Sequence, residues 1–83
     1  MWYHSDIKNK ELHQKIRNKQ IVFGGNINLK IFGTLSCKSG QRMQKKNRIF
    51  FSTANEAEQQ HYRPCGHCMR EDYKKWKEKN GLI

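Results

Sequence analysis

Two of the chain's three cysteines, Cys65 and Cys68, lie in the stretch CGHC and are separated by two residues. This spacing lets one turn direct both sulfurs to the same side, where they can hold a tetrahedral metal ion or form a redox couple. A structural zinc ion takes further ligands from a distant segment, and Cys37 offers a third thiolate. We therefore predict a zinc site that contains Cys37, Cys65 and Cys68.

The fourth zinc ligand stays open at this point. Histidine is a common partner of cysteine at zinc, and the chain has four histidines, His4, His13, His61 and His67. The ring of His67 is expected to point away from an ion that its neighbour Cys68 binds. His61 could fold back from just before the cysteine pair, and His4 could pack over the site from the N-terminus. We rank His4 and His61 level, with water as a further alternative.

Redox chemistry is an alternative use of the same cysteines. CGHC also occurs at the active site of protein disulfide isomerases, where a cysteine at a helix N-terminus has a lowered pKa and acts as a nucleophile. That motif follows a strand of a thioredoxin-like scaffold, whereas a short helix and a loop precede it here. The zinc interpretation is therefore favoured over the redox one.

Size and composition limit the fold. A domain of 83 residues buries only ~60% of its unfolded surface, so its core alone is marginal and a metal ion would add support. Three thiols cannot form a closed disulfide framework. No apolar run approaches the ~20 residues that span a bilayer, and the N-terminus lacks the apolar region of a signal peptide. We expect one cytoplasmic domain over residues 1–83, without membrane contact.

The charge is large and unevenly distributed. Seventeen Lys and Arg against seven Asp and Glu give a formal charge of +10, and no acidic residue lies between Leu12 and Asn55. A positive surface of this kind attracts phosphate and steers association with polyanions. Nucleic acid is therefore the expected partner, and a solvated surface or an acidic protein partner is the alternative.

Sequence patterns predict the elements that position the cysteines. Ser5 can cap a first helix that runs from Asp6 to about Lys19. Residues 20–23 and 27–32 are rich in β-forming types and flank Gly24-Gly25-Asn26, which predicts a β-hairpin with its turn at those three residues. A basic loop follows from Cys37 to Arg48.

The second half of the chain gives stronger signals. Ile49 to Phe51 form a third short strand, with Phe50 and Phe51 on opposite faces and one of them inward. Thr53 and Glu56 fit a capping box that begins a helix of about two turns ending near His61. A last helix runs from about Met69 to Lys79. The expected fold class is a small zinc-stapled α+β domain with a β-hairpin, a third short strand and two to three helices.

Two segments resemble the metal-binding N-terminal domain of the Ada DNA-repair family. The stretch IFGTLSC at 31–37 is similar to the pattern I-F-C-R-P-S-C of that family. The stretch FFSTANEAEQQHYRPCGHC at 50–68 is similar to its aromatic strand, short helix and Arg-Pro-Cys-x-x-Cys lead-in. The resemblance implies a small α+β module in which four cysteines hold zinc and one of them accepts a methyl group from a DNA phosphotriester.

This chain departs from the family pattern at the acceptor. Cys37, Cys65 and Cys68 match three of the four family cysteines, and the fourth, which takes the methyl group, falls at Gly33. We therefore expect a zinc-binding, DNA-binding module of repair or transcription that contacts phosphates and lacks the usual acceptor. An active methylphosphotriester methyltransferase using Cys37 is the enzymatic alternative, and a redox or protein-interaction module is another. The expected phosphate contacts are Lys38, Arg42, Lys45, Lys46, Arg48, Arg63 and Arg70.

Overall fold

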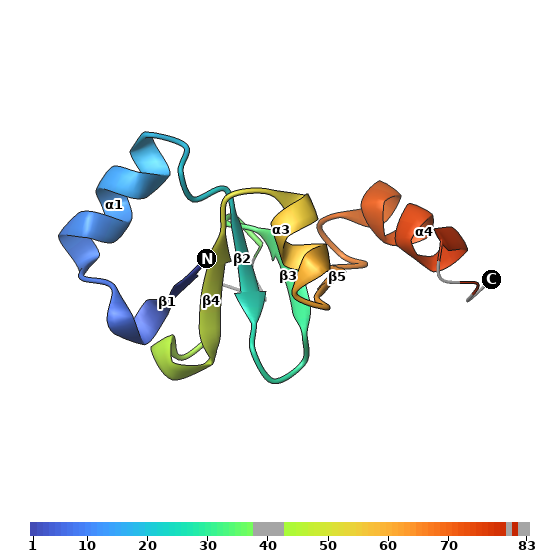
Figure 1. Ribbon diagram of the computed structural model, residues 1–83, viewed down its shortest axis with the longest axis horizontal. Helices are drawn as coiled ribbons and strands as arrows, with labels where there is room; N and C mark the ends of the chain where they lie inside the picture. The colour runs from blue at the N-terminus through green and yellow to red at the C-terminus, as the bar shows by residue number, and fades with distance from the viewer. Residues whose placement is uncertain (38–42, 80, 82–83) are drawn as a thin grey trace.

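A five-stranded sheet forms the centre of the computed structural model, which describes residues 1–37, 43–79 and 81 (Figure 1). The strand order is β1-β4-β2-β3-β5, and all neighbours are antiparallel except the parallel pair β3 and β5. The strands are β1 (Trp2–Tyr3), β2 (Phe23–Asn26), β3 (Ile31–Thr34), β4 (Arg48–Phe51) and β5 (Arg63–Pro64). The α+β class predicted from the sequence is confirmed, and β1 and β5 are two short strands that the sequence did not predict.

The hairpin exists, but its predicted turn was wrong. Gly24, Gly25 and Asn26 belong to strand β2, and the chain turns over residues 27–30 instead. The side chain of Asn26 accepts hydrogen bonds from the backbone N–H groups of Asn28 and Leu29, at 2.9 and 3.0 Å, which closes the turn. Gly25 is held in the sheet by its pairing with β3 and β4, and glycine suits this position because a β-carbon would come 3.1 Å from the Ile31 carbonyl oxygen.

The described residues contain three α-helices, α1 (Asn9–Arg17), α3 (Ala54–Gln59) and α4 (Arg70–Lys79), of which α4 extends from the β5 edge of the sheet (Figure 1). The predicted start of the first helix was wrong, because residues His4–Asp6 form a separate 3₁₀ helix, η1, and α1 begins only at Asn9. The N-cap of α1 is Lys8, not Ser5, and no side chain caps it. None of the helices in the described part of the chain is both long and apolar enough to cross a membrane.

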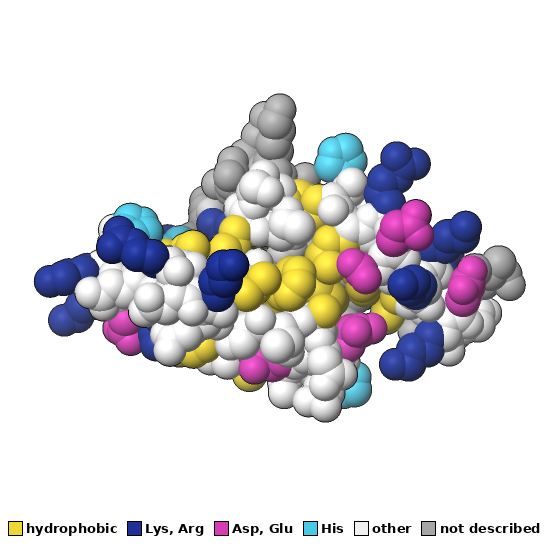
Figure 2. Space-filling model, turned by 90° about the horizontal axis from the view of Figure 1, so that it is seen from above, with side chains coloured by type: hydrophobic (Ala, Val, Ile, Leu, Met, Phe, Trp, Pro, Cys, Tyr) yellow, Lys and Arg dark blue, Asp and Glu magenta, His cyan; other side chains and the backbone are white. Residues whose placement is uncertain are grey.

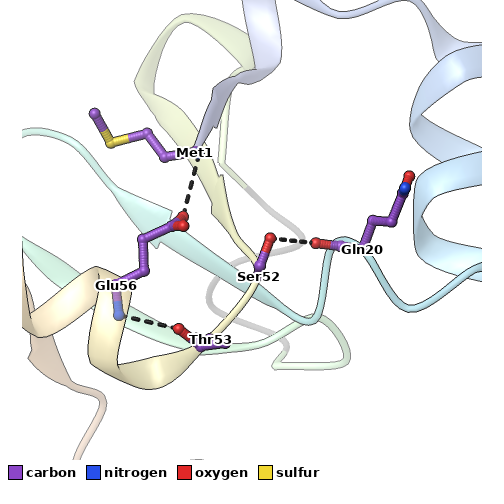
Figure 3. Close-up of polar contacts among 5 residues, drawn as sticks. All are labelled: Met1, Gln20, Ser52, Thr53 and Glu56. Carbon is purple, nitrogen blue, oxygen red and sulfur yellow. Dashed lines mark hydrogen bonds and ion pairs between the residues drawn. The ribbon is translucent and has the colours of Figure 1, made fainter.

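Of the predicted capping box of α3, the Thr53 half is recorded among the described residues, whereas the Glu56 carboxylate faces the N-terminus. The side chain of Thr53 accepts a hydrogen bond from the backbone N–H of Glu56 at 3.1 Å (Figure 3). The carboxylate of Glu56 lies 3.2 Å from the N-terminal ammonium of Met1, so it ties β1 to α3. The neighbouring hydroxyl of Ser52 donates to the carbonyl oxygen of Gln20 at 2.6 Å and fixes the end of β4 to the segment that enters β2.

The core lies on both faces of the sheet, which corrects the expectation that only one of two adjacent phenylalanines is inward. On one face, Phe51 packs with Phe32 of β3 and Ala57 of α3. On the other face, Phe50 packs with Leu12 of α1. Phe50 is 1% exposed and Phe51 is 0% exposed. Alternation along β4 still places them on opposite faces, and both are buried because a helix covers each face (Figure 1).

Candidate metal centre

Three local structures bring the cysteines together at the β3–β5 end of the sheet. Cys37 follows β3 after a turn in which its backbone N–H donates to the carbonyl of Thr34 at 3.2 Å. Cys65 follows β5, and its N–H donates to the carbonyl of Phe32 at 2.7 Å. Cys68 completes the turn that leads into α4. The pairing of β3 with β5 therefore connects the two cysteine segments, which lie far apart in the sequence.

The three sulfurs form one group. The Sγ atoms of Cys37, Cys65 and Cys68 lie within 4.8 Å of one another, and none of the three cysteines is in a disulfide. A tetrahedral zinc ion with Zn–S bonds of ~2.3 Å holds its sulfurs roughly 3.8 Å apart, so only a small contraction of the group is needed. The geometry and the soft sulfur donors fit zinc.

Backbone N–H groups in the cysteine turn stabilise a thiolate at Cys65. Burial raises the pKa of the Cys65 thiol, but backbone hydrogen bonds from Cys68 and His67 outweigh it and hold that pKa below its ordinary value. The N–H of His67 lies 3.4 Å from the Cys65 sulfur. Burial raises the pKa of the Cys68 thiol, and its hydrogen bond with Cys37 raises that pKa further. Metal binding requires thiolates, and the lowered pKa of Cys65 favours one.

Gly33 lies against the sulfur group. A β-carbon on Gly33 would come 2.6 Å from the Cys68 sulfur, 3.2 Å from the Cβ of Cys65 and 3.9 Å from the Cβ of Cys37. A side chain at this position would therefore enter the group directly. The sequence resemblance places the fourth cysteine of the family at the same position.

The structure does not bring His4 or His61 into the sulfur group. Of the Cys, His, Asp and Glu side chains in the described residues, the group contains only the three cysteines. His4 follows β1, at the opposite edge of the sheet, and its ring contacts Phe50 edge-on with 5.1 Å between centroids. Three strand spacings of about 4.8 Å place β1 roughly 14 Å from β3. His61 is exposed beyond the end of α3, with a φ of 67°.

The predicted phosphate contacts have different environments. Lys45 and Lys46 are exposed in a 3₁₀ helix, η2 (Lys45–Asn47), and Arg70 is exposed at the start of α4. The Arg63 guanidinium packs over the ring of Tyr73 at 5.0 Å and donates to the carbonyl of Pro64. Arg48 is half-buried. The predictions for Lys38 and Arg42 lie outside the described residues.

The cations have few carboxylate partners. Among the described residues, the recorded ion pair joins the N-terminal ammonium to Glu56, and no Lys or Arg side chain lies within 4.0 Å of a carboxylate. Figure 2 shows Lys and Arg over both ends of the long axis, with hydrophobic side chains between them on this face. The positive charge is therefore available to an external anion.

A pocket of about 280 Å³ adjoins the sulfur group. Gly24, Gly33, Arg48, Cys37 and Cys65 are among the residues that line it. This pocket is a feature that sequence reasoning missed. The glycines of β2 and β3 were the available signal, since glycine inside a strand marks a place where another group approaches the backbone.

The fold and site define a small α+β domain with a three-sulfur metal centre at one end of its sheet. A family model described as the metal binding domain of Ada matches residues 11–71, which is most of the chain. The chain belongs to this family. Neither the curated proteins nor the solved structures gave a match. The family and the sulfur group together assign zinc as the cofactor.

Proposed function

We propose that the protein is a zinc-binding module that contacts the phosphate backbone of DNA and does not transfer methyl groups. The observation that carries the proposal is the position of unpaired cations beside the sulfur group. Arg70 is two residues from Cys68, and Arg48 lines the same pocket as Cys37 and Cys65. Lys45 and Lys46 are exposed in η2, three and two residues before Arg48, and extend the cationic surface from Arg48 toward η1. Zinc would fix the β3–β5 end of the sheet and so hold this cationic surface in place.

Gly33 is the reason that we propose no methyl transfer. In the family pattern a cysteine at this position accepts the methyl group, and here the position has no side chain. Cys37 is a poor substitute, because it is 8% exposed and one of the three grouped sulfurs, so alkylation would remove a metal ligand. Binding without transfer is therefore the function that we propose. We also propose that the protein works in a reducing compartment such as the cytoplasm, where the thiols stay free to bind the metal.

Salt dependence of DNA affinity tests the contact. Each neutralised phosphate contributes ~0.9 to the slope of log affinity against log salt. We predict that the double substitution Lys45→Gln and Lys46→Gln lowers this slope by about 1.8. The matched control is Lys8→Gln with Lys10→Gln, which removes the same charge from the exposed start of α1 and should leave the slope near that of the unaltered protein.

The outcomes separate the alternatives. Equal slopes for the two double variants would show that net charge, rather than the η2 surface, binds DNA. A flat salt response in the unaltered protein would favour an acidic protein partner. Incubation with phosphate-methylated DNA followed by intact mass spectrometry should show no methylated chain, and a mass increase on a cysteine peptide would establish the transferase activity instead.

A further inference from the structure

The pocket beside the sulfur group has two chemically different ends. Gly24 on β2 and Gly33 on β3 face each other across the antiparallel pair and both line the pocket. Positions paired in this way have β-carbons about 4.5–5.5 Å apart. With no side chain at either position, the space above this part of the sheet stays open.

A cation occupies the Gly24 end. A β-carbon on Gly24 would lie 3.4 Å from both Nε and Nη2 of Arg48, so the guanidinium extends across this glycine. Its face lies over the ring of Phe50, 5.1 Å from the centroid. The buried Nε has no hydrogen-bond partner among the described residues. A buried donor of this kind is costly to leave unpaired, which favours an anionic partner in the pocket.

The sulfur group occupies the Gly33 end. The cysteines supply three sulfurs, whereas zinc in a structural site takes four ligands, and a site with three protein ligands keeps one position for an exogenous group. The remaining walls are mostly apolar, with Leu29, Ile31 and Met43, and they also include the polar residues Asn26 and Thr34. A ligand here therefore meets a soft metal site at one end, an apolar middle and a guanidinium at the other end.

We propose that this pocket binds a small thiol that carries a carboxylate, with its sulfur beside Gly33 as the fourth sulfur donor and its carboxylate on Arg48. A thiol and a carboxylate joined by two methylene groups have a reach comparable to the about 4.5–5.5 Å between the paired β-carbon positions of Gly24 and Gly33. On binding, the S–H bond breaks, the proton leaves to the solvent and the sulfur becomes a metal ligand, with no change of oxidation state. The inference rests on the zinc site of the proposed function, and because Arg48 serves in both proposals its test uses no DNA.

Arg48 also accounts for the choice of an acid over a neutral thiol. A fourth thiolate raises the negative charge of a site whose three thiolates already exceed the charge of a divalent ion. The guanidinium pairs with the carboxylate, so the carboxylate adds no uncompensated charge, and this charge-assisted hydrogen bond is strong in a mostly apolar pocket. A neutral thiol of the same length gains only the sulfur contact.

Cobalt substitution tests the proposal. The full chain is loaded with Co²⁺, and the thiolate-to-metal absorption is followed during titration with 3-mercaptopropionate, 2-mercaptoethanol or propionate. We expect the absorption to rise toward that of a four-sulfur site with both thiols, with the mercapto acid binding more tightly, and to stay unchanged with propionate. Arg48→Gln should lower the affinity for 3-mercaptopropionate by roughly tenfold or more and leave the affinity for 2-mercaptoethanol unchanged.

Two further variants keep the test decisive. Arg17→Gln removes one guanidinium from the exposed end of α1 and should change neither thiol affinity. Gly24→Ala adds a methyl group to the pocket floor and should lower the affinity for both thiols. Normal cobalt absorption that no thiol alters would overturn the inference and leave the metal site intact. Equal losses of affinity for the two thiols in Arg48→Gln would also overturn the inference alone. Failure of the chain to bind cobalt at all would overturn the metal site and the inference together.

Discussion

Alanine at two adjacent glycines should have opposite effects on stability. Gly24 and Gly25 lie side by side in β2 and point to opposite faces of the sheet. At Gly24 the nearest atoms to an added β-carbon are those of the flexible Arg48 side chain, at 3.4 Å. At Gly25 the β-carbon would meet the Ile31 carbonyl oxygen at 3.1 Å and ring and methyl carbons of Phe51 and Ile49 at 3.2 and 3.3 Å.

These distances set the expected magnitudes. Replacing a strand glycine by alanine gains roughly 0.5–1 kcal/mol where the site has room, because the unfolded chain loses freedom. Gly24→Ala should therefore be neutral or stabilising by up to that amount. Gly25→Ala presses on backbone and on a buried core, and overpacking of this kind costs about 1–3 kcal/mol. The two variants should thus differ clearly in the free energy of unfolding.

Urea unfolding of the zinc-loaded variants measures the difference. The midpoints should order as Gly24→Ala at or above the unaltered protein and Gly25→Ala well below it, with similar m-values. If both residues instead formed the hairpin turn, as the sequence alone suggested, positive φ angles would make both alanines destabilising. Equal losses would therefore refute the strand assignment of these residues and, with it, the glycine floor of the pocket.

Two further predictions concern the N-terminal half of the fold and the α3 cap. Thr53→Ala removes the acceptor for the Glu56 N–H and should cost about 1 kcal/mol in urea unfolding, and Thr53→Ser should restore most of it; equal losses in both variants would contradict the cap. Burial, followed by the charges of Arg48 and Lys45, lowers the pKa of His4, so the unfolded chain binds more protons below the ordinary value of 6.5. The free energy of unfolding should therefore fall as the pH is lowered below that value. His4→Gln should reduce this slope and His13→Gln, on the exposed side of α1, should not; an unchanged slope in His4→Gln would contradict the burial argument.

Local signals predicted the second half of the chain well. Thr53 caps α3 as its hydroxyl requires, and the strand at 49–51 and the helix that ends at Lys79 are present. The helix expected to end near His61 ends at Gln59, and His61 has a φ of 67° just beyond it. In each case neighbouring residues determine the structure, so a single sequence is sufficient.

The errors lie where distant contacts decide. Gly24 and Gly25 suit a turn by type, but neighbouring strands hold them in the sheet, and the side chain of Asn26 makes the turn two residues later. Strand β5 has only two residues and pairs with β3 from a distant part of the chain, so no local pattern marks it. The strand order, with β1 and β5 at opposite edges, sets the separation of the cysteines from His4, which sequence spacing could not reveal.

The metal site was predictable in part. The C-x-x-C spacing identified Cys65 and Cys68, and the need of zinc for a ligand from a distant segment indicated Cys37, which also matches the family pattern. The pocket was not predictable, because it depends on Arg48 of β4 reaching over a glycine of the neighbouring strand. That contact needs the strand order, which no local signal contains.

Native mass spectrometry of the freshly purified chain tests the central claim most directly, since it counts zinc ions per protein. We predict one zinc ion in the unaltered protein and in His4→Ala and His61→Ala, and loss of that ion in Cys37→Ser. A metal-free unaltered protein, or full zinc occupancy in Cys37→Ser, would contradict a site in which Cys37 joins Cys65 and Cys68 on a single ion.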